Sequence, residues 1–412
     1  MTENSRTERP PTLLETIFNT VDSVARRIAD FVPLTRGIRN AARSSGEDLV
    51  SWKNVREIAV AALELQRDKP EPISGQMIDQ YQNMLRDAQK QVAEYTGLVA
   101  TGLPSEVEVF TQPDWIDANI VSFRFLFDPI SEKYVTLLAE MEEEQAAAAG
   151  RRARRVARTV LSVQVGIIMG YMARNVLGQF DLSIPEPERG GRLYVVESNV
   201  QRVETNTGMN PREFRQWITL HEVTHSFEFH CNSWLRDHLS NSMQEYLNTI
   251  DWRGLSGPDL FRKIRQSRAN IQSDDALQAG GLISIMATPE QRAVLGRLQA
   301  MMCVLEGYSN HVMDQVGKEL LPSYETMKRR FEQRRESKSA AERLFQRLIG
   351  ISLKLQQYKV GQAFVDAVVE QEGLVFLNRV WEKAENMPSM EEVNNPLIWI
   401  DRMKGIIKNF PV

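Results

Sequence analysis

The sequence predicts a mainly helical protein with one small β-sheet, a fold of the α+β class in which helices dominate. Three observations support this prediction: apolar residues recur at helical spacing along most of the chain, strand signals are sparse, and no long linker divides the sequence. The 412 residues, 42% of them hydrophobic and 25% charged, have the composition of a globular protein with a sizeable core. We expect a flexible polar tail over 1–10 and a single large domain over 11–412.

Helices are expected in order along the first half of the chain. After Pro10 and Pro11, leucine, isoleucine and valine residues follow the helical period, and similar patterns recur up to residue 176. Beyond Pro211 the pattern is again almost entirely helical as far as Trp399. The helices predicted before Pro211 cover 13–28, 51–65, 74–96, 114–127, 131–144 and 153–176.

Strand signals are confined to two short segments. Residues 107–111 alternate in polarity, and residues 193–200 are apolar and β-branched, so we expect a small sheet. The apolar helix predicted over 153–176 contains Gly166 and Gly170 at a GxxxG spacing. Its uncharged stretch falls short of the roughly 20 apolar residues that a membrane span needs. We therefore expect a buried helix that packs closely against a neighbour, not a membrane-inserted one.

Composition argues against several classes of protein. The chain has 50 Lys and Arg against 54 Asp and Glu, a formal net charge of -4, which excludes a globally basic nucleic-acid-binding protein. An arginine-rich run over 151–158 could bind phosphate, but a solvated helix end is favoured because no aromatic residues are interleaved to stack on bases. Two cysteines and no signal peptide indicate a cytoplasmic protein. No sequence feature identifies a protein partner.

The motif that carries chemistry is HEVTH at 221–225. Because the chain has only five histidines, an HExxH pattern would arise by chance about once in two hundred such sequences. Asn210 is a good helix cap, Pro211 suits the first helical position, and Glu213 stands where a capping-box acid belongs. A helix therefore begins just before the motif and places both histidines on its apolar side, one turn apart.

This spacing has a physical reason. The imidazoles of His221 and His225 differ by about 40° around the helix, so both could reach one ion at about 2.0–2.1 Å. Glu222 would point to the open side of that ion and act as the general base on a water that the metal activates. The set describes metal-assisted hydrolysis with zinc as the cofactor. The alternative is that both histidines are core residues with separate hydrogen-bond partners.

A catalytic zinc site needs a third protein ligand. The extended metzincin pattern fails here, because Glu228 and Cys231 stand where it has glycine and histidine. A second helix is predicted to start with Thr288 as its cap and Gln291 at the capping-box position. Glu306 lies on the apolar stripe of this helix, where a carboxylate is costly unless it is paired or binds metal. Glu306 is therefore the predicted third ligand, and the alternative is an acid at the stripe's edge that reaches water. The metal site would form between helices near 211–230 and 289–315.

Residues that follow the third ligand on the same helix are candidates for supporting roles. Gly307 permits the close approach of another backbone. Asn310, His311 and Asp314 could orient the metal ligands. Tyr308 and His311 are the best candidates to donate a hydrogen bond to a developing oxyanion.

Several segments carry a resemblance to a known family. They are WIDAN at 115–119, VLGQFDL at 176–182, HEVTH at 221–225, LEGYSNHVMD at 305–314, RRFEQRR at 329–335, KLQQYKVGQAF at 354–364 and PLIWIDR at 396–402. Together these segments resemble a bacterial family of zincin-like hydrolases, described as zinc-dependent metalloproteases, some of which are associated with deazaflavin-cofactor biosynthesis. The resemblance spans roughly residues 110–402.

The resemblance implies a multihelical zincin-like metallohydrolase fold. It also implies that His221, His225 and Glu306 bind the metal, that Glu222 is the base, and that GRLYVVESNV at 191–200 is the strand beside the cleft. It implies no particular substrate, and it leaves the role of the N-terminal hundred residues open.

Two hypotheses follow for the function. The leading one is a zinc-dependent metallopeptidase that acts on a peptide or a small amide. The competing one is a non-catalytic scaffold or interaction protein, in which the His/Glu cluster is a structural metal site or a buried polar network. Cys231 and Cys303 are expected to be buried, reduced thiols. Lys354, Gln357 and Tyr358 could line the cleft, but we favour a role in tying two helices together.

Overall fold

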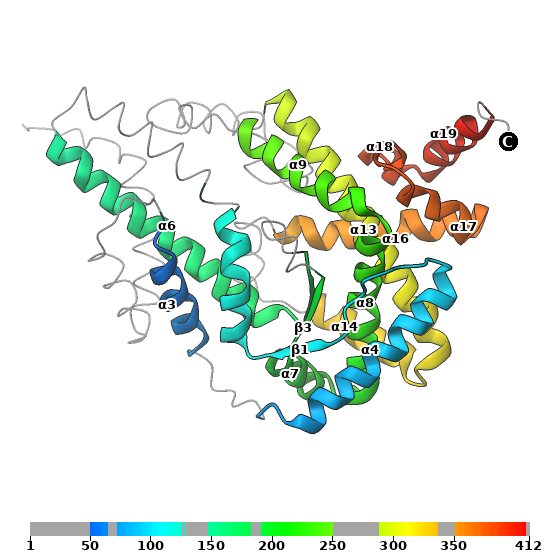
Figure 1. Cartoon of the computed structure of the whole chain (residues 1–412), viewed down its shortest axis with the longest axis horizontal. Helices are drawn as coiled ribbons and strands as arrows, with labels where there is room; N and C mark the ends of the chain where they lie inside the picture. Colours follow the sequence, from blue (N-terminus) through cyan, green and yellow to red (C-terminus); the bar gives the residue numbers. More distant parts are fainter. Residues whose placement is uncertain are drawn as a thin grey trace, which may run out of the picture. The chain divides into compact units, whose positions relative to one another are not determined.

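The computed structural model describes residues 50–64, 72–125, 128, 147–182, 191–249, 288–336 and 351–408. These residues form mainly helices with one three-stranded sheet, as the sequence predicts (Figure 1). The tail over 1–10 and the helices expected over 13–28 and 131–144 lie outside the described residues. The chain groups into two compact units, each of which is taken by itself below. The single domain over 11–412 stays a prediction.

The first unit is built on α3 (Trp52–Leu63) and most of α6 (Ala147–Asn175). The GxxxG glycines of α6 face α3: a Cβ on Gly166 would lie 2.8 Å from the nearest α3 side chain, and one on Gly170 would lie 2.9 Å from an α3 carbonyl oxygen. The close packing expected from this spacing is therefore present. Within the described part of the chain, no helix combines the length and apolar character that crossing a bilayer requires.

The second unit contains the sheet and the helices that carry the predicted site. Its helices share one apolar core, to which α4, α8, α13 and α16 all contribute buried side chains. Its helices are α4 (Gly75–Thr96), α7 (Glu197–Thr207), α8 (Pro211–Cys231), α9 (Ser233–Thr249), α13 (Pro289–Leu320), α14 (Tyr324–Glu336), α16 (Ile351–Glu372), α17 (Leu374–Leu377), α18 (Met390–Asn394) and α19 (Pro396–Lys408), with the 3₁₀ turns η3 (Asn378–Trp381) and η4 (Ala384–Asn386). A helix over 112–125 begins in this unit.

The sheet has the strand order β1-β3-β2. β1 (Val107–Phe110) pairs in parallel with β3 (Arg192–Val196), and β2 (Gly178–Asp181) pairs antiparallel with β3 at the other edge. The strand predicted over 107–111 is present. The strand predicted over 193–200 ends four residues early, at Val196, because the polar residues that follow form the first turn of α7, where an acid is favoured.

The sequence carries no strand signal for β2, because this short edge strand combines a glycine with polar residues. Side chains of the 112–125 helix hold it in place. The indole Nε1 of Trp115 donates to Oε1 of Gln179 at 2.7 Å, and Nε2 of Gln179 donates to Oδ1 of Asn119 at 2.9 Å. The position of β2 therefore depends on contacts about sixty residues away in sequence.

A buried ion-pair network fixes the first half of α8. Arg215 donates through Nε to Oε1 of Glu204 at 2.9 Å, and its Nη2 lies 3.0 Å from Oε1 of Glu197. The hydroxyl of Tyr81 donates to Oε2 of Glu197 at 2.6 Å. Because both acids are buried, loss of this arginine would leave two uncompensated carboxylates.

Candidate metal centre

The helix that carries the HEVTH motif begins as the sequence predicts. The side chain of Asn210 accepts hydrogen bonds from the backbone N–H groups of Arg212 and Glu213, at 3.0 and 3.3 Å. Pro211 takes the first helical position. The capping-box role predicted for Glu213 is wrong. Its carboxylate instead accepts from the backbone N–H and the hydroxyl of Ser323, at 2.8 and 2.6 Å, because the start of α14 brings two donors to it.

The second helix of the site also has a defined start and a tight crossing. Thr288 and Gln291 form a reciprocal capping box, as the sequence predicts. Further along, α13 crosses α16 where Gly307 meets Gly361, and a Cβ on either glycine would overlap backbone atoms of the other helix. The close approach predicted at Gly307 is therefore present. It fixes the position of the preceding residue, Glu306, relative to α16.

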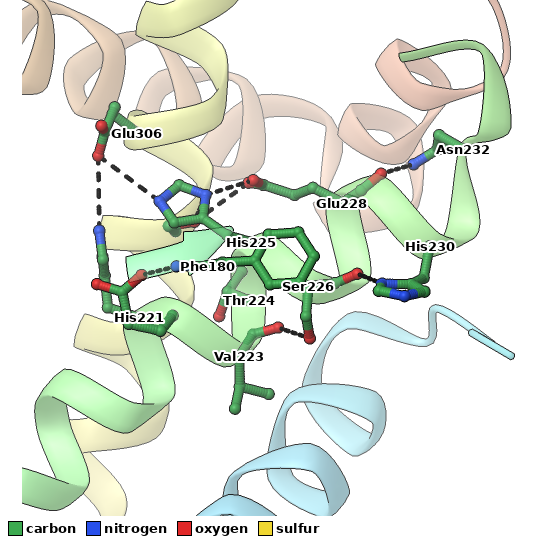
Figure 2. Close-up of polar contacts among 12 residues, drawn as sticks. Phe180, His221, Val223, Thr224, His225, Ser226, Glu228, His230, Asn232 and Glu306 are labelled. Atoms are coloured by element: carbon green, nitrogen blue, oxygen red, sulfur yellow. Dashed lines mark hydrogen bonds and ion pairs between the residues drawn. The ribbon is translucent and has the colours of Figure 1, made fainter. Parts of the chain in front are cut away.

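The structure brings together His221, His225 and Glu306 (Figure 2). Oε2 of Glu306 lies 3.5 Å from Nε2 of His221 and 3.7 Å from Nε2 of His225. Among the described residues, Nδ1 of His221 is buried without a hydrogen-bond partner. The three donor atoms all lie within 4.8 Å of one another.

This spacing fits a metal ion better than a hydrogen-bonded cluster. Ligand atoms bound at about 2.0–2.1 Å in a tetrahedral shell lie roughly 3.3–3.4 Å from one another. The separations of 3.5 and 3.7 Å between the carboxylate of Glu306 and the two imidazoles are close to that value. They are longer than a normal N–H···O hydrogen bond. Two imidazoles and one carboxylate are also a donor set that zinc accepts.

A second carboxylate, from Glu228, orients one of the histidines. Its Oε2 lies 2.7 Å from Nδ1 of His225, on the side of the ring away from Glu306 (Figure 2). The hydroxyl of Ser309 lies 3.0 Å from the same Nδ1 and donates to Oε1 of Glu228 at 3.2 Å. Sequence reasoning missed both residues, although Glu228 follows His225 by three positions and so lies on the same helical face.

Burial and charge act in opposite directions at this pair. Burial lowers the pKa of His225, but the carboxylates of Glu228 and Glu306 more than compensate and hold it well above its ordinary value. Burial raises the pKa of Glu228 to about 7, although His225 opposes this shift. The fully buried acid therefore depends on the imidazole for its compensation.

Glu222 is held against the edge strand of the sheet. Its Oε2 accepts from the backbone N–H of Phe180 in β2 at 2.9 Å. The strand approaches closely because Gly178 has no side chain: a Cβ there would lie 2.7 Å from Cγ of Glu222. The sequence places Glu222 on α8, but only the fold reveals β2 as its partner.

Tyr308 and His311 make their hydrogen bonds elsewhere. The hydroxyl of Tyr308 donates to Oδ1 of Asn378 at 2.7 Å, and the residue is fully buried. His311 lies with Nδ1 2.6 Å from Oδ1 of Asp366 and with Nε2 2.8 Å from the hydroxyl of Tyr95. The oxyanion role of Tyr308 and His311 stays a prediction.

Asn310 and Asp314 are both buried on α13. Asp314 pairs with Lys328, and its Oδ2 accepts from Nε2 of Gln362 at 2.8 Å. The supporting roles of Asn310 and Asp314 stay predictions. Both cysteines are free thiols; the burial predicted for Cys303 is confirmed, and that predicted for Cys231 is wrong, because Cys231 is only half-buried. The side chains of Lys354, Gln357 and Tyr358 lie outside the described part of the chain.

Comparison with known proteins gives two matches. A family model described as zincin-like metallopeptidase matches residues 50–400. A crystal structure from Chloroflexus aurantiacus, described as that of a candidate hydrolase with a novel fold, is 35% identical to this chain with a TM-score of 0.63. The match covers 86% of this chain and 99% of that one. No curated protein matches.

Proposed function

The chain belongs to the zincin-like metallopeptidase family, and we propose that it is a zinc-dependent hydrolase that cleaves a peptide or a small amide. The observation that carries this proposal is the convergence of His221, His225 and Glu306 at separations suited to a shared ion. The HExxH spacing and the second helix supply two imidazoles and a carboxylate, which is the ligand set of a catalytic zinc site with an open position.

Each residue has a distinct role in this proposal. His221, His225 and Glu306 would hold the zinc ion. When bound, zinc acts as a Lewis acid that polarises a carbonyl and lowers the pKa of water. Glu222 would accept the proton of the attacking water, and its hydrogen bond with Phe180 holds it in a fixed orientation beside the first histidine.

Glu228 and Ser309 would serve the site without touching substrate. Their contacts with Nδ1 of His225 leave Nε2 directed toward Glu306. A carboxylate behind a ligating histidine fixes its ring orientation and raises its basicity. We therefore include both as positioning residues.

Glu222→Gln tests the proposed base. Zinc content and hydrolysis of a peptide library should be measured on the wild type, on this variant and on Glu391→Gln, a matched change at an exposed acid of α18. We expect Glu222→Gln to keep its zinc and to lose hydrolysis by at least about a hundredfold, while the control stays at the wild-type rate. Hydrolysis by Glu222→Gln at the wild-type rate would refute the assignment.

A structural metal site is the second candidate, and one observation counts against it. Structural zinc sites are closed by four protein ligands, whereas the cluster among the described residues has three. Chelation separates the two functions. A large loss of stability on chelation, in a protein whose zinc-loaded form hydrolyses nothing, would favour the structural site.

A further inference from the structure

A stripe of polar side chains on the 112–125 helix is bonded to the strand that contacts Glu222. Gln112, Trp115 and Asn119 follow one another by three and then four positions, so they lie on one face of the helix. Trp115 and Asn119 are buried, and Gln112 is half-buried. We call these three residues the polar stripe; the proposed function leaves them without a role.

The polar stripe holds β2 through the side-chain amide of Gln179. Oε1 of Gln179 accepts from the indole Nε1 of Trp115 at 2.7 Å, and its Nε2 donates to Oδ1 of Asn119 at 2.9 Å. Neighbouring side chains of a strand point to opposite faces. Gln179 thus points to the polar stripe, whereas the adjacent Gly178 packs against the side chain of Glu222. The strand therefore lies between the polar stripe and the proposed base.

The same stripe also fixes the chain just before β2. Nε2 of Gln112 donates to Oδ1 of Asn199 at 2.7 Å, and Asn199 is fully buried. Nδ2 of Asn199 in turn donates to the carbonyl oxygens of Ala173 and Val176, at 2.7 and 2.6 Å. The polar stripe is thus connected to the chain at the entrance to β2 and again within the strand. Buried hydrogen bonds are directional, so they specify one position of the strand more closely than apolar contacts could.

The position of β2 bears on Glu222 because the strand supplies its hydrogen-bond donor. The backbone N–H of Phe180 donates to Oε2 of Glu222 at 2.9 Å. A slip of one residue would turn Gln179 away from the polar stripe and bring a different backbone group to the carboxylate. The apolar pattern of β2 specifies its register only weakly, because Phe180 is its one residue with an apolar side chain. A catalytic group misplaced by about 1 Å can lose about a hundredfold in rate.

We propose that Gln179 is a positioning residue for Glu222, and that the polar stripe holds β2 in the register that presents the N–H of Phe180 to the base. The consequence for hydrolysis rests on the proposed function, whereas the coupling between Gln179 and Glu222 does not. Metal binding should be unaffected, because the three proposed metal ligands are carried by α8 and α13.

Amide hydrogen exchange of the full-length, zinc-free protein tests this coupling, measured by NMR at the N–H of Phe180. Gln179→Met keeps the length of the side chain and removes both hydrogen bonds, and Trp115→Phe removes only the indole donor. We expect both to speed this exchange, by about tenfold or more in Gln179→Met. The matched control is Gln89→Met on α4, where a half-buried glutamine donates to the carbonyl of Pro104 at 2.8 Å. The control should stay within about twofold of the wild-type rate.

A double substitution separates positioning from a general loosening of the strand. Glu222→Ala removes the acceptor and should itself speed exchange at Phe180. Adding Gln179→Met should then change the rate by less than about twofold, because the contact that it controls is already lost. Additive effects of the two substitutions, or wild-type exchange in both Gln179→Met and Trp115→Phe, would overturn the proposal.

Hydrolysis gives a second readout. In zinc-loaded Gln179→Met, kcat on a peptide that the wild type cleaves should fall about 10- to 100-fold, while KM and zinc affinity stay within about twofold. A wild-type kcat in this variant, together with faster exchange, would overturn the positioning role. If the wild type cleaves no peptide but the exchange coupling is present, the proposed function fails and the coupling of Gln179 to Glu222 stands.

Discussion

Two clusters, each with one residue on α13, combine histidine with carboxylate, and they differ in the distance between the two groups. At Glu306 the carboxylate lies 3.5 and 3.7 Å from Nε2 of His221 and His225. At Asp366 the carboxylate lies 2.6 Å from the Nδ1 of His311, whose other nitrogen is 2.8 Å from a tyrosine hydroxyl. In the first set the carboxylate faces the two imidazoles from beyond normal hydrogen-bond distance, whereas the second set is a chain of hydrogen bonds.

This difference separates a candidate metal centre from a hydrogen-bonded cluster. The separations between Glu306 and the two imidazoles leave room for an ion among His221, His225 and Glu306. His311 leaves no such room, because Tyr95 and Asp366 lie at hydrogen-bond distance from its two nitrogens.

Removing a carboxylate from each cluster is the strongest way to test the comparison. Glu306→Gln should lower the affinity for zinc by well over about a hundredfold, because one of three ligands is lost. The matched change Asp366→Asn should leave that affinity within about twofold, since it affects the second cluster alone. Competition with a chromophoric chelator measures both. Similar losses in the two variants would contradict the distinction.

The crossing that sets α13 against α16 offers a second test. Gly361→Ala should destabilise the protein by about 3 kcal/mol and also weaken zinc binding, because the new Cβ would displace the helix that carries Glu306. Gly405→Ala is the control, since its Cβ would meet no atom within 4 Å on α19, and it should be neutral or slightly stabilising. Urea unfolding gives the free energies. Equal stability of the two variants would show that the crossing tolerates a methyl group.

The support behind His225 should have a smaller effect on the metal. Glu228→Gln keeps the size of the side chain but weakens its hold on Nδ1, so zinc affinity should fall about 10- to 100-fold. Ser309→Ala should act in the same direction with a smaller loss. The readout is again chelator competition, with Asp366→Asn as the reference for a carboxylate behind a histidine that binds no metal. Unchanged affinity in Glu228→Gln would remove this residue from the site.

The smallest loss of stability is expected at Tyr308. Tyr308→Phe removes the hydroxyl that donates to Asn378, which should cost about 1 kcal/mol of stability. If Tyr308 stabilises the oxyanion as predicted, hydrolysis by this variant should also fall by about a hundredfold or more while its zinc content stays constant. Steady-state kinetics on the zinc-loaded variant decide this, and a wild-type rate would end that role for Tyr308.

The features that could be predicted from sequence are those contained within one helix. The start of α8 at Asn210, the one-turn spacing of His221 and His225, and the capping box of Thr288 with Gln291 all depend on neighbours a few residues apart. Glu306 belongs here as well, because a carboxylate on an apolar stripe already indicates a buried partner. These features were predicted from the spacing of nearby residues, and the helices of the structure agree with the predictions.

The errors and omissions concern partners that are distant in sequence. Glu213 bonds to Ser323 instead of closing a capping box, and β2 pairs with β3 although its residues carry no strand pattern. The spacing of Glu228 from His225 was visible in the sequence. Ser309 contacts Glu228 only because α8 and α13 pack against each other. Such contacts depend on which helices meet.

The sequence by itself therefore determined the helical class of the protein and the chemistry that it can offer: two imidazoles, a neighbouring acid and a distant carboxylate. The tertiary structure decided which carboxylate faces those imidazoles and which histidine is satisfied elsewhere. The physical reason is the distance along the chain over which each kind of interaction acts. Helical periodicity acts over one or two turns, whereas the crossing at Gly307 and Gly361 places side chains by backbone contact between segments about fifty residues apart.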